Sequence, residues 1–94
     1  MNDNFLPDYT DVEKAHDIIH KYAHQTPVLT SASINKIVGG SLFFKCENFQ
    51  KVGAFKFRGA CNAVFSLSEE EAQKGVATHS SGNHAAALAL AAKM

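Results

Sequence analysis

An alanine-rich segment at residues 85–92, AAALALAA, is the feature that most constrains how this chain can fold. Alanine and leucine are strong helix formers, and the segment contains no polar side chain. A helix that is apolar on all sides is stable only when neighbouring elements bury most of its surface. We therefore expect a helix over residues 85–92 that is buried on most sides. The chain of 94 residues ends shortly after it without supplying a further layer. A chain of this length holds one small core or part of a larger one.

The segments before that helix alternate between extended and helical patterns. Residues 26–29 (TPVL) favour extended backbone, because proline restricts the residue that precedes it. Residues 41–46 (SLFFKC) are β-prone and mostly apolar, which is typical of a strand buried on both faces. Residues 76–78 (VAT) predict another short strand. Strands that alternate with helices indicate a layered α/β fold.

Capping residues and apolar periodicity predict four earlier helices. Thr10 and Glu13 can form a capping box at the start of a helix over residues 11–23, and Ser68 and Glu71 can do the same for a polar helix that ends at Gly75. A short helix is expected after Thr30 or Ser31, continuing to Val38 and ended by Gly39 and Gly40. A fourth helix is expected over residues 55–65.

Composition excludes several classes of function. Nine basic and nine acidic side chains give a formal net charge of zero, which argues against a nucleic-acid or anionic-membrane partner. No apolar run approaches the roughly 20 residues of a membrane span. Residues 1–9 predict a loose leader without a secretory signal. With only Cys46 and Cys61, we expect reduced thiols in a cytoplasmic protein.

Three histidines raise the question of a metal site. His16, His20 and His24 lie four residues apart, a spacing that can hold a metal between helical turns. They drift away from the apolar face of the predicted helix, and no cysteine accompanies them. We therefore interpret them as a solvated flank and predict no metal ligands in this chain.

The first candidate for chemistry is the segment GAFKFRGA at residues 53–60. Lys56 stands between Phe55 and Phe57 at the start of a predicted helix. An ammonium in apolar surroundings near other positive charge loses its proton, and the neutral amine attacks carbonyl carbons. A Schiff-base lysine needs this environment. The alternative is an ordinary amphipathic helix whose lysine extends into water.

The second candidate is THSSGNH at residues 78–84, between a predicted strand and the alanine-rich helix. Unpaired N–H groups and the positive helix dipole at that helix start suit a carboxylate or a phosphate. Gly82 permits close approach of a ligand to the backbone. Ser81, Asn83 and His84 add a hydroxyl, an amide and an imidazole. The alternative is a polar N-cap in which serine is the capping residue.

The order and spacing of these two segments resemble those of the fold-type II (tryptophan-synthase β-like) pyridoxal-phosphate enzymes. Residues 47–60 (ENFQKVGAFKFRGA) match the family's pyridoxal-lysine signature, and residues 80–84 (SSGNH) match its substrate-carboxylate loop. Within the family, the sequence is similar to the serine racemase and serine/threonine dehydratase branch. Three further segments also resemble this branch: residues 11–16 (DVEKAH), 26–31 (TPVLTS) and 42–47 (LFFKCE).

This resemblance implies a role for each matched residue. Lys56 would form the Schiff base with pyridoxal 5'-phosphate and act as a base on one face of the substrate Cα, and Ser81 would exchange a proton on the opposite face. Asn83 would hydrogen-bond to the phenolic oxygen of the cofactor, and Phe55 would pack beside its ring. The substrate carboxylate would be held by Ser80, Ser81, Gly82 and His84.

The resemblance also implies that this chain is the N-terminal part of a three-layer α/β/α catalytic fold. Residues of about 10–67 would belong to the large domain, and residues of about 68–94 would begin the small domain. The phosphate-binding loop and the ligands of a divalent metal in the full-length enzyme would lie beyond residue 94, so we expect the 94-residue chain alone to be inactive. The full-length form would be a homodimer or homotetramer.

A nucleotide effector is a further implication of the resemblance, with Ser31 and Lys51 at the matching positions. The sequence departs from the family nearby, because Ala32, Val52 and Ala86 stand where polar side chains are expected. Ala54 likewise replaces a serine that many members have beside the lysine.

Three functions therefore remain in consideration. The first is a pyridoxal-phosphate-dependent dehydratase (ammonia-lyase) or racemase of serine or threonine. The second is a β-replacement synthase of the same fold. The third is a non-catalytic piece that binds a partner or dimerises through the apolar helix.

Overall fold

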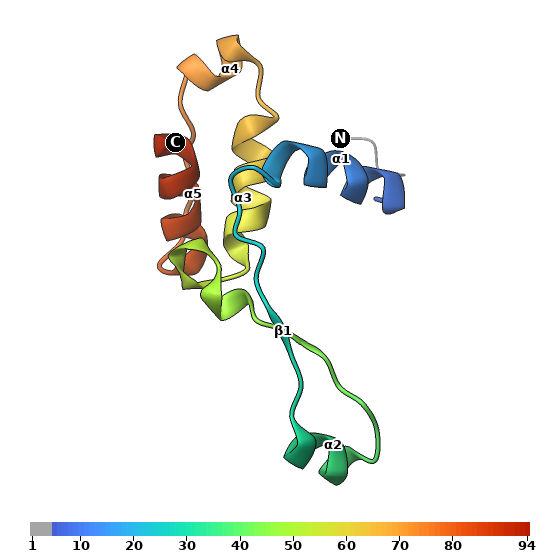
Figure 1. Ribbon diagram of the computed structural model, residues 1–94. Coiled ribbons are helices and arrows are strands. Elements are labelled where there is room, and N and C mark those ends of the chain that lie inside the picture. Colours follow the sequence, from blue (N-terminus) through green and yellow to red (C-terminus); the bar gives the residue numbers. More distant parts are fainter. Residues whose placement is uncertain (1–4) are drawn as a thin grey trace.

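The computed structural model describes residues 5–94, so the first four residues of the predicted leader lie outside the described part. Figure 1 shows a helical body and an arm, residues 26–46, that projects from it and lengthens the molecule to 53 Å. The elements in chain order are α1 (Tyr9–Ile19), β1 (Val28–Leu29), α2 (Ala32–Val38), β2 (Phe44–Lys45), the 3-10 turns η1 (Glu47–Phe49) and η2 (Lys51–Gly53), α3 (Lys56–Phe65), α4 (Glu69–Gln73) and α5 (Asn83–Lys93).

Helix α1 is capped by Asp8. One carboxylate oxygen of Asp8 accepts hydrogen bonds from the backbone N–H groups of Thr10 (2.8 Å) and Asp11 (3.2 Å), and the Asp11 carboxylate accepts one from the Asp8 N–H (2.9 Å). The predicted box of Thr10 and Glu13 is therefore wrong, because an aspartate two residues earlier already satisfies the first turn. The Thr10 hydroxyl instead donates to Asp8, and this bond is the main reason that the pKa of Asp8 is lowered.

Helix α1 also ends earlier than predicted, at Ile19 instead of residue 23. The Nδ1 atom of His20 lies 3.1 Å from the carbonyl oxygen of His16, so the imidazole can satisfy the last turn when that nitrogen is protonated. Beyond this cap the chain turns, and Tyr22 stacks on Phe65 of α3 with ring centroids 4.0 Å apart. Packing against α3 thus overrides the helical periodicity of residues 20–23.

The arm contains a two-stranded antiparallel sheet, in which Val28 pairs with Lys45 and Leu29 with Phe44. The predicted helix between the strands is confirmed: Ser31 caps α2, and Gly39 ends it with a left-handed φ of 69°. The prediction that residues 41–46 form a strand buried on both faces is wrong for the described residues, because only Phe44–Lys45 is a strand and both residues are exposed.

Residues 66–82 connect α3 to α5 through the short helix α4. The predicted capping box is present, with Ser68 accepting from the Glu71 N–H (3.2 Å) and Glu71 accepting from the Ser68 N–H (2.9 Å). Gly75, at φ 78°, ends this turn as expected. Residues 76–78 are not a strand, because the described part of the chain offers them no strand partner.

Helices α3 and α5 confirm the predicted helices at residues 55–65 and 85–92, and they form the centre of the body. They pack side by side and run in the same direction, so that both begin at the same end (Figure 1). Ala87 and Ala91, one turn apart on α5, share one face and let the helices approach closely. The buried cluster consists of Ile19, Phe57, Ala60, Cys61, Ala87 and Ala91.

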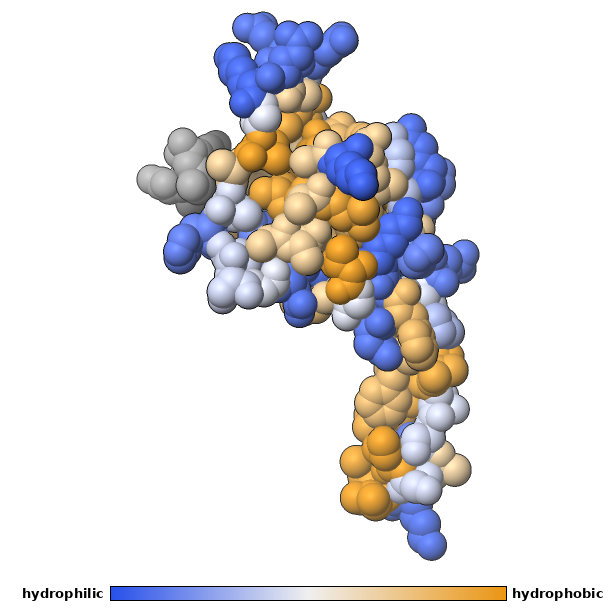
Figure 2. Space-filling model, turned by 90° about the vertical axis from the view of Figure 1, so that its left-hand side faces the viewer, coloured by the Kyte–Doolittle hydropathy of each residue, from blue (hydrophilic) through white to orange (hydrophobic). Residues whose placement is uncertain are grey.

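The burial expected for α5 is only partly present among the described residues. Its α3-facing side is buried, whereas Ala86, Ala89 and Ala92 are exposed. Figure 2 shows the resulting apolar area on the outer, exposed side of α5. A shallow groove runs there between α5 and residues 76–78. No helix within residues 5–94 is long and apolar enough to cross a membrane.

Candidate active site

Lys56 is the first residue of α3 and is exposed to solvent. Its Nζ lies 5.2 Å from the centroid of the Phe55 ring, within the range of a cation–π contact. The neighbour on the other side, Phe57, is fully buried in the core. The apolar surroundings predicted for this amine are therefore wrong for the described residues: Lys56 is exposed, with one flanking ring nearby and the other buried in the core.

The turn before Lys56 has an unusual backbone. Val52 has φ 59° and Gly53 has φ 71°, so two consecutive residues adopt left-handed conformations. This is strained for a β-branched valine and free of strain for a glycine. The side chain of Val52 nevertheless packs against the core. The turn directs the chain from η2 into the first turn of α3.

The loop at residues 80–84 leads into α5. The Ser80 hydroxyl oxygen accepts hydrogen bonds from the N–H groups of Gly82 and Ala85, both at 3.2 Å. The serine N-cap considered from sequence is not present, because the N-cap of α5 is Gly82, which has no side chain to cap the helix. Ser80, two residues earlier, instead satisfies the Ala85 N–H of the first turn. Ser81, Asn83 and His84 are exposed. The Ser81 hydroxyl has no hydrogen-bond partner among residues 5–94 and is free to interact with a ligand.

The two predicted segments lie at the same end of the body. Because α3 and α5 run in the same direction, Lys56 and the 80–84 loop both lie at the end where these helices begin, next to η2 (Figure 1). Both helix dipoles present their positive ends here. The arrangement combines a primary amine, a free hydroxyl and an environment that favours an anion.

An ion pair that the sequence motifs did not single out lies behind Lys56. Arg58 donates to the Glu47 carboxylate through Nη2 at 2.6 Å and through Nε at 2.9 Å. The bonds from Arg58 are the main reason that the pKa of Glu47 is lowered. Both residues lie within the lysine signature at residues 47–60. The sequence signal for this ion pair is a carboxylate before the lysine and a guanidinium after it within the same motif.

Ser31 and Lys51 are not brought together. Ser31 begins α2 near the tip of the arm, whereas Lys51 lies in η2 in the body, with its Nζ 5.6 Å from the centroid of the Phe57 ring (Figure 1). The nucleotide-effector site stays a prediction.

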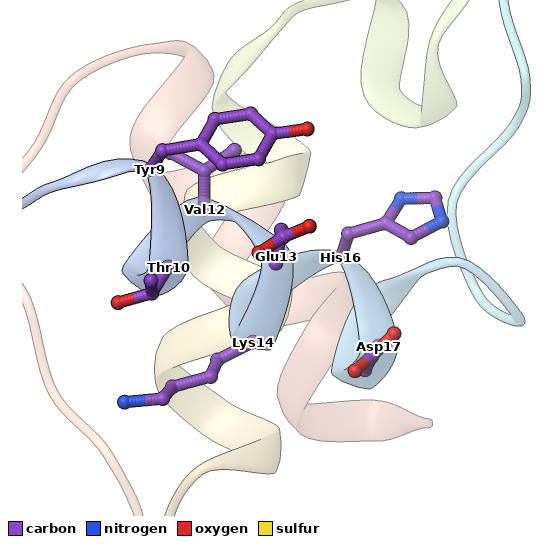
Figure 3. A pocket seen from close by; sticks show the side chains of 7 residues that line it. All are labelled: Tyr9, Thr10, Val12, Glu13, Lys14, His16 and Asp17. Carbon is purple, nitrogen blue, oxygen red and sulfur yellow. The ribbon is translucent and has the colours of Figure 1, made fainter.

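His16, in α1, and His20, directly after it, do not form a metal site with other side chains of the described residues. The rings of His16 and His20 stack with centroids 5.3 Å apart, and within residues 5–94 no three histidine, cysteine or acidic side chains are grouped as metal ligands. The depression in Figure 3 is likewise formed by α1 alone and contains none of the predicted site residues. Its lining residues are Tyr9, Thr10, Val12, Glu13, Lys14, His16 and Asp17.

The sequence pattern of the family described as "Pyridoxal-phosphate dependent enzyme" matches residues 19–94, which include Lys56 and the 80–84 loop. The chain belongs to this family. It is 65% identical to a serine racemase of Arabidopsis thaliana over 92 residues, which cover 98% of this chain and 28% of that protein. It is 54% identical to a beta-hydroxyaspartate dehydratase of Paracoccus denitrificans over 90 residues, which cover 96% of this chain and 29% of that protein.

A solved structure of maize serine racemase matches the fold with a TM-score of 0.90 and 57% identity, covering 95% of this chain and 28% of that structure. These matches confirm the predicted family and fold: the chain corresponds to the N-terminal part of a fold-type II pyridoxal-phosphate enzyme. It spans less than a third of the length of these relatives.

Proposed function

We propose that this chain is the part of a pyridoxal-phosphate-dependent serine racemase and dehydratase that carries the cofactor lysine, Lys56. One observation carries the proposal: in a member of this family, the exposed amine of Lys56 and the free hydroxyl of Ser81 lie at the same end of two parallel helices. Serine and threonine are the proposed substrates, because serine racemases are among the relatives.

The residues present fit the cofactor. Lys56 supplies an accessible amine, and Phe55, 62% exposed, offers an aromatic face beside it. The exposed Asn83 supplies an amide, which would donate a hydrogen bond to the phenolic oxygen of the cofactor. When bound, pyridoxal phosphate withdraws electrons from the substrate Cα, which makes the Cα proton removable.

The residues of this chain then divide the work of proton transfer and binding. Lys56 Nζ removes or returns the Cα proton on one face of the substrate, and Ser81 Oγ does so on the opposite face. The substrate carboxylate is held at the start of α5, where the helix dipole favours negative charge. The residues that form this cradle are Ser80, Ser81, Gly82 and His84.

Racemisation and elimination share the removal of the Cα proton, and they differ in the next step. Elimination then expels the β-hydroxyl of the substrate, whereas racemisation returns a proton on the other face. The similarity to a hydroxyaspartate dehydratase supports elimination as a second activity of the same site. A β-replacement synthase is distinguished by incorporation of sulfide into serine.

The assembly and the domain division belong to the same proposal. We propose a homodimer or homotetramer for the full-length enzyme, with residues of about 10–67 in the large domain and those of about 68–94 opening the small domain. A divalent metal, where the full-length enzyme uses one, would be bound by residues outside this chain.

The Lys56→Ala variant of the full-length enzyme tests the cofactor assignment. We expect it to lose both racemisation and elimination, and borohydride treatment should trap no cofactor on the protein, because no amine remains at this position. Lys36→Ala, which removes an exposed lysine of α2, is the matched control and should retain both properties. A borohydride-trapped cofactor on another lysine of the Lys56→Ala variant would refute the assignment. A wild-type enzyme without bound cofactor would favour the non-catalytic alternative.

A further inference from the structure

The first turn of α3, which carries Lys56, lacks the usual means of holding a helix start. Phe55 at the N-cap provides no side-chain hydrogen bond, and the first two backbone bonds are long, at 3.5 Å (Phe57 N–H to Ala54) and 3.3 Å (Arg58 N–H to Phe55). The turn contains two cations, Lys56 and Arg58, and no acidic residue. Cations at the positive end of a helix dipole are unfavourable. Something outside the helix must hold this turn in place.

Arg58 provides that attachment. Besides its two bonds to Glu47, its Nη2 donates to the carbonyl oxygen of His24 at 3.2 Å. The same Glu47 oxygen accepts from the hydroxyl of buried Thr26 at 2.9 Å. The second oxygen of Glu47 is buried without a partner among residues 5–94, so its charge is balanced through Arg58.

Gln50 adds further hydrogen bonds to the network formed by Arg58, Glu47, Thr26 and His24. Its side-chain oxygen accepts from the N–H groups of His24 (2.9 Å) and Lys51 (3.0 Å), and its nitrogen donates to the His24 carbonyl (2.8 Å). Gln50 is 3% exposed, so these bonds are shielded from competition with water. The segment after α1, the two 3-10 turns and the first turn of α3 are thereby joined by one polar network.

Lys56 and Arg58 use opposite sides of the helix. Residues two apart are separated by about 200° around a helix axis, so Arg58 can face the polar network while Lys56 faces the proposed site. We propose that Glu47, Gln50 and Arg58 are positioning residues that fix the first turn of α3 and thereby the reach of the Lys56 amine. That the network holds the first turn of α3 is inferred from its hydrogen bonds alone. That it thereby affects cofactor capture by Lys56 rests on the proposed function.

Hydrogen–deuterium exchange of the full-length enzyme without cofactor tests the structural part. Arg58→Lys keeps the positive charge and loses the forked geometry that reaches Glu47 and His24 together. We expect exchange to be about tenfold faster in a peptide covering residues 55–60 and unchanged in one covering residues 61–66. Val64→Ala, a core substitution near the other end of α3, is the control for general destabilisation and should not accelerate the first peptide selectively.

The rate at which Lys56 captures added pyridoxal phosphate tests the consequence. We expect Arg58→Lys and Glu47→Gln to slow capture about tenfold, measured as borohydride-trapped cofactor on the Lys56 peptide, because a small displacement of a reacting group has a large effect on rate. Val64→Ala should capture the cofactor at the wild-type rate. If Arg58→Lys does not fold, Glu47→Gln, which retains one oxygen acceptor, is used for both measurements.

The outcomes separate this inference from the proposed function. Trapping on another lysine in the wild type would refute the role of Lys56 and would leave the exchange result to decide the network. Wild-type trapping on Lys56, with an unchanged rate in Arg58→Lys and Glu47→Gln, would refute the positioning role. Equal effects of Arg58→Lys and Val64→Ala on capture would also refute it, because they would show a response to stability alone.

Discussion

Ser80 and Ser81 are adjacent and chemically identical, yet their surroundings give them different tasks. The Ser80 hydroxyl accepts two backbone N–H groups at the start of α5, whereas the Ser81 hydroxyl is free among the described residues. Ser80 is therefore suited to holding the proposed carboxylate cradle in shape, whereas Ser81 has a hydroxyl that can also exchange a proton with the substrate. This pair provides a matched test of the proposed chemistry.

In the full-length enzyme, Ser81→Ala should reduce racemisation of L-serine at least 100-fold and elimination to pyruvate only a few-fold. In the proposed chemistry, elimination requires proton removal on the Lys56 face, whereas inversion also requires an acid or base on the other face. Chiral chromatography of serine and an assay of pyruvate measure the two rates. An equal loss of both activities would show that Ser81 only binds the substrate.

Ser80→Ala should behave differently, because this variant loses the two hydrogen bonds that hold the loop before α5. We expect a decrease in the free energy of unfolding of about 1 kcal/mol, as for other lost intramolecular hydrogen bonds, and a parallel decrease of both activities. Urea denaturation and the same two assays measure these effects. A selective loss of racemisation in Ser80→Ala would mean that the roles of the two serines are reversed.

The two cysteines should differ in reactivity by at least tenfold. Cys61 is fully buried, and this burial raises the pKa of its thiol, so it is both inaccessible and neutral at pH 7. Cys46 is half-buried at the base of the arm. Alkylation of the native full-length enzyme with iodoacetamide, followed by mass spectrometry, should modify Cys46 first. In urea the two should react at similar rates; faster native labelling of Cys61 would contradict the packing of α3.

At the scale of elements, the sequence predicted those helices whose ends are set by nearby residues. Helix α2 is bounded by Ser31 and Gly39, and the box of Ser68 and Glu71 begins α4 as expected. These signals act over three or four residues, so no distant contact is needed to read them. The predicted start of α1 was wrong for a related reason: a second residue that can cap the helix, Asp8, lies two positions before Thr10.

The failures elsewhere concern contacts between distant residues. A strand at residues 76–78 needs a partner strand, and the described chain supplies none. Motif spacing predicted Lys56 and Ser81 as site residues. It could not show that Arg58 bonds to His24, 34 positions away, or that Gln50 bonds to it from 26 positions away. Such pairs become visible only when the fold is known.

The stabilisation provided by the ion pair between Arg58 of α3 and Glu47 of η1 should depend on pH. Because the pKa of Glu47 is lowered in the folded state, its carboxylate stabilises the fold above its unfolded pKa, near 4.5, and this contribution is lost as the pH falls through the lowered value. The difference in free energy of unfolding between wild type and Glu47→Gln should therefore be largest at neutral pH and shrink below pH 4.5.

Urea denaturation of both full-length proteins between pH 7 and pH 3 measures this difference. Asp8 and Glu71 also have lowered pKa values, but they are present in both proteins, so their effects cancel in the comparison. A difference that is constant over this range would show that the carboxylate charge of Glu47 does not stabilise the fold.

At the scale of the whole molecule, the described chain exposes much apolar surface in two places. The arm presents large apolar side chains, among them Ile37 (83% exposed) and Phe43 (71% exposed), and the outer side of α5 presents alanines beside Val76 (Figure 2). Exposed apolar areas of this kind are covered in stable proteins by further structure or by a partner. In the proposed enzyme, the rest of the protein would cover them.

We therefore expect the 94-residue chain by itself to self-associate and to bind pyridoxal phosphate weakly, without turnover of serine. The exposed apolar surface drives association, and the little surface that is buried offsets only part of the chain entropy, so tertiary packing should be loose. Sedimentation, near-ultraviolet circular dichroism and titration with the cofactor measure these properties. The double substitution Ile37→Lys and Phe43→Ser, at two exposed positions of the arm, should reduce association without lowering helix content, whereas Ile19→Ser in the core should increase it. A monomer that unfolds cooperatively and binds the cofactor saturably on Lys56 would contradict this expectation, because it would mean that α1, α3 and α5 suffice as an autonomous folding unit.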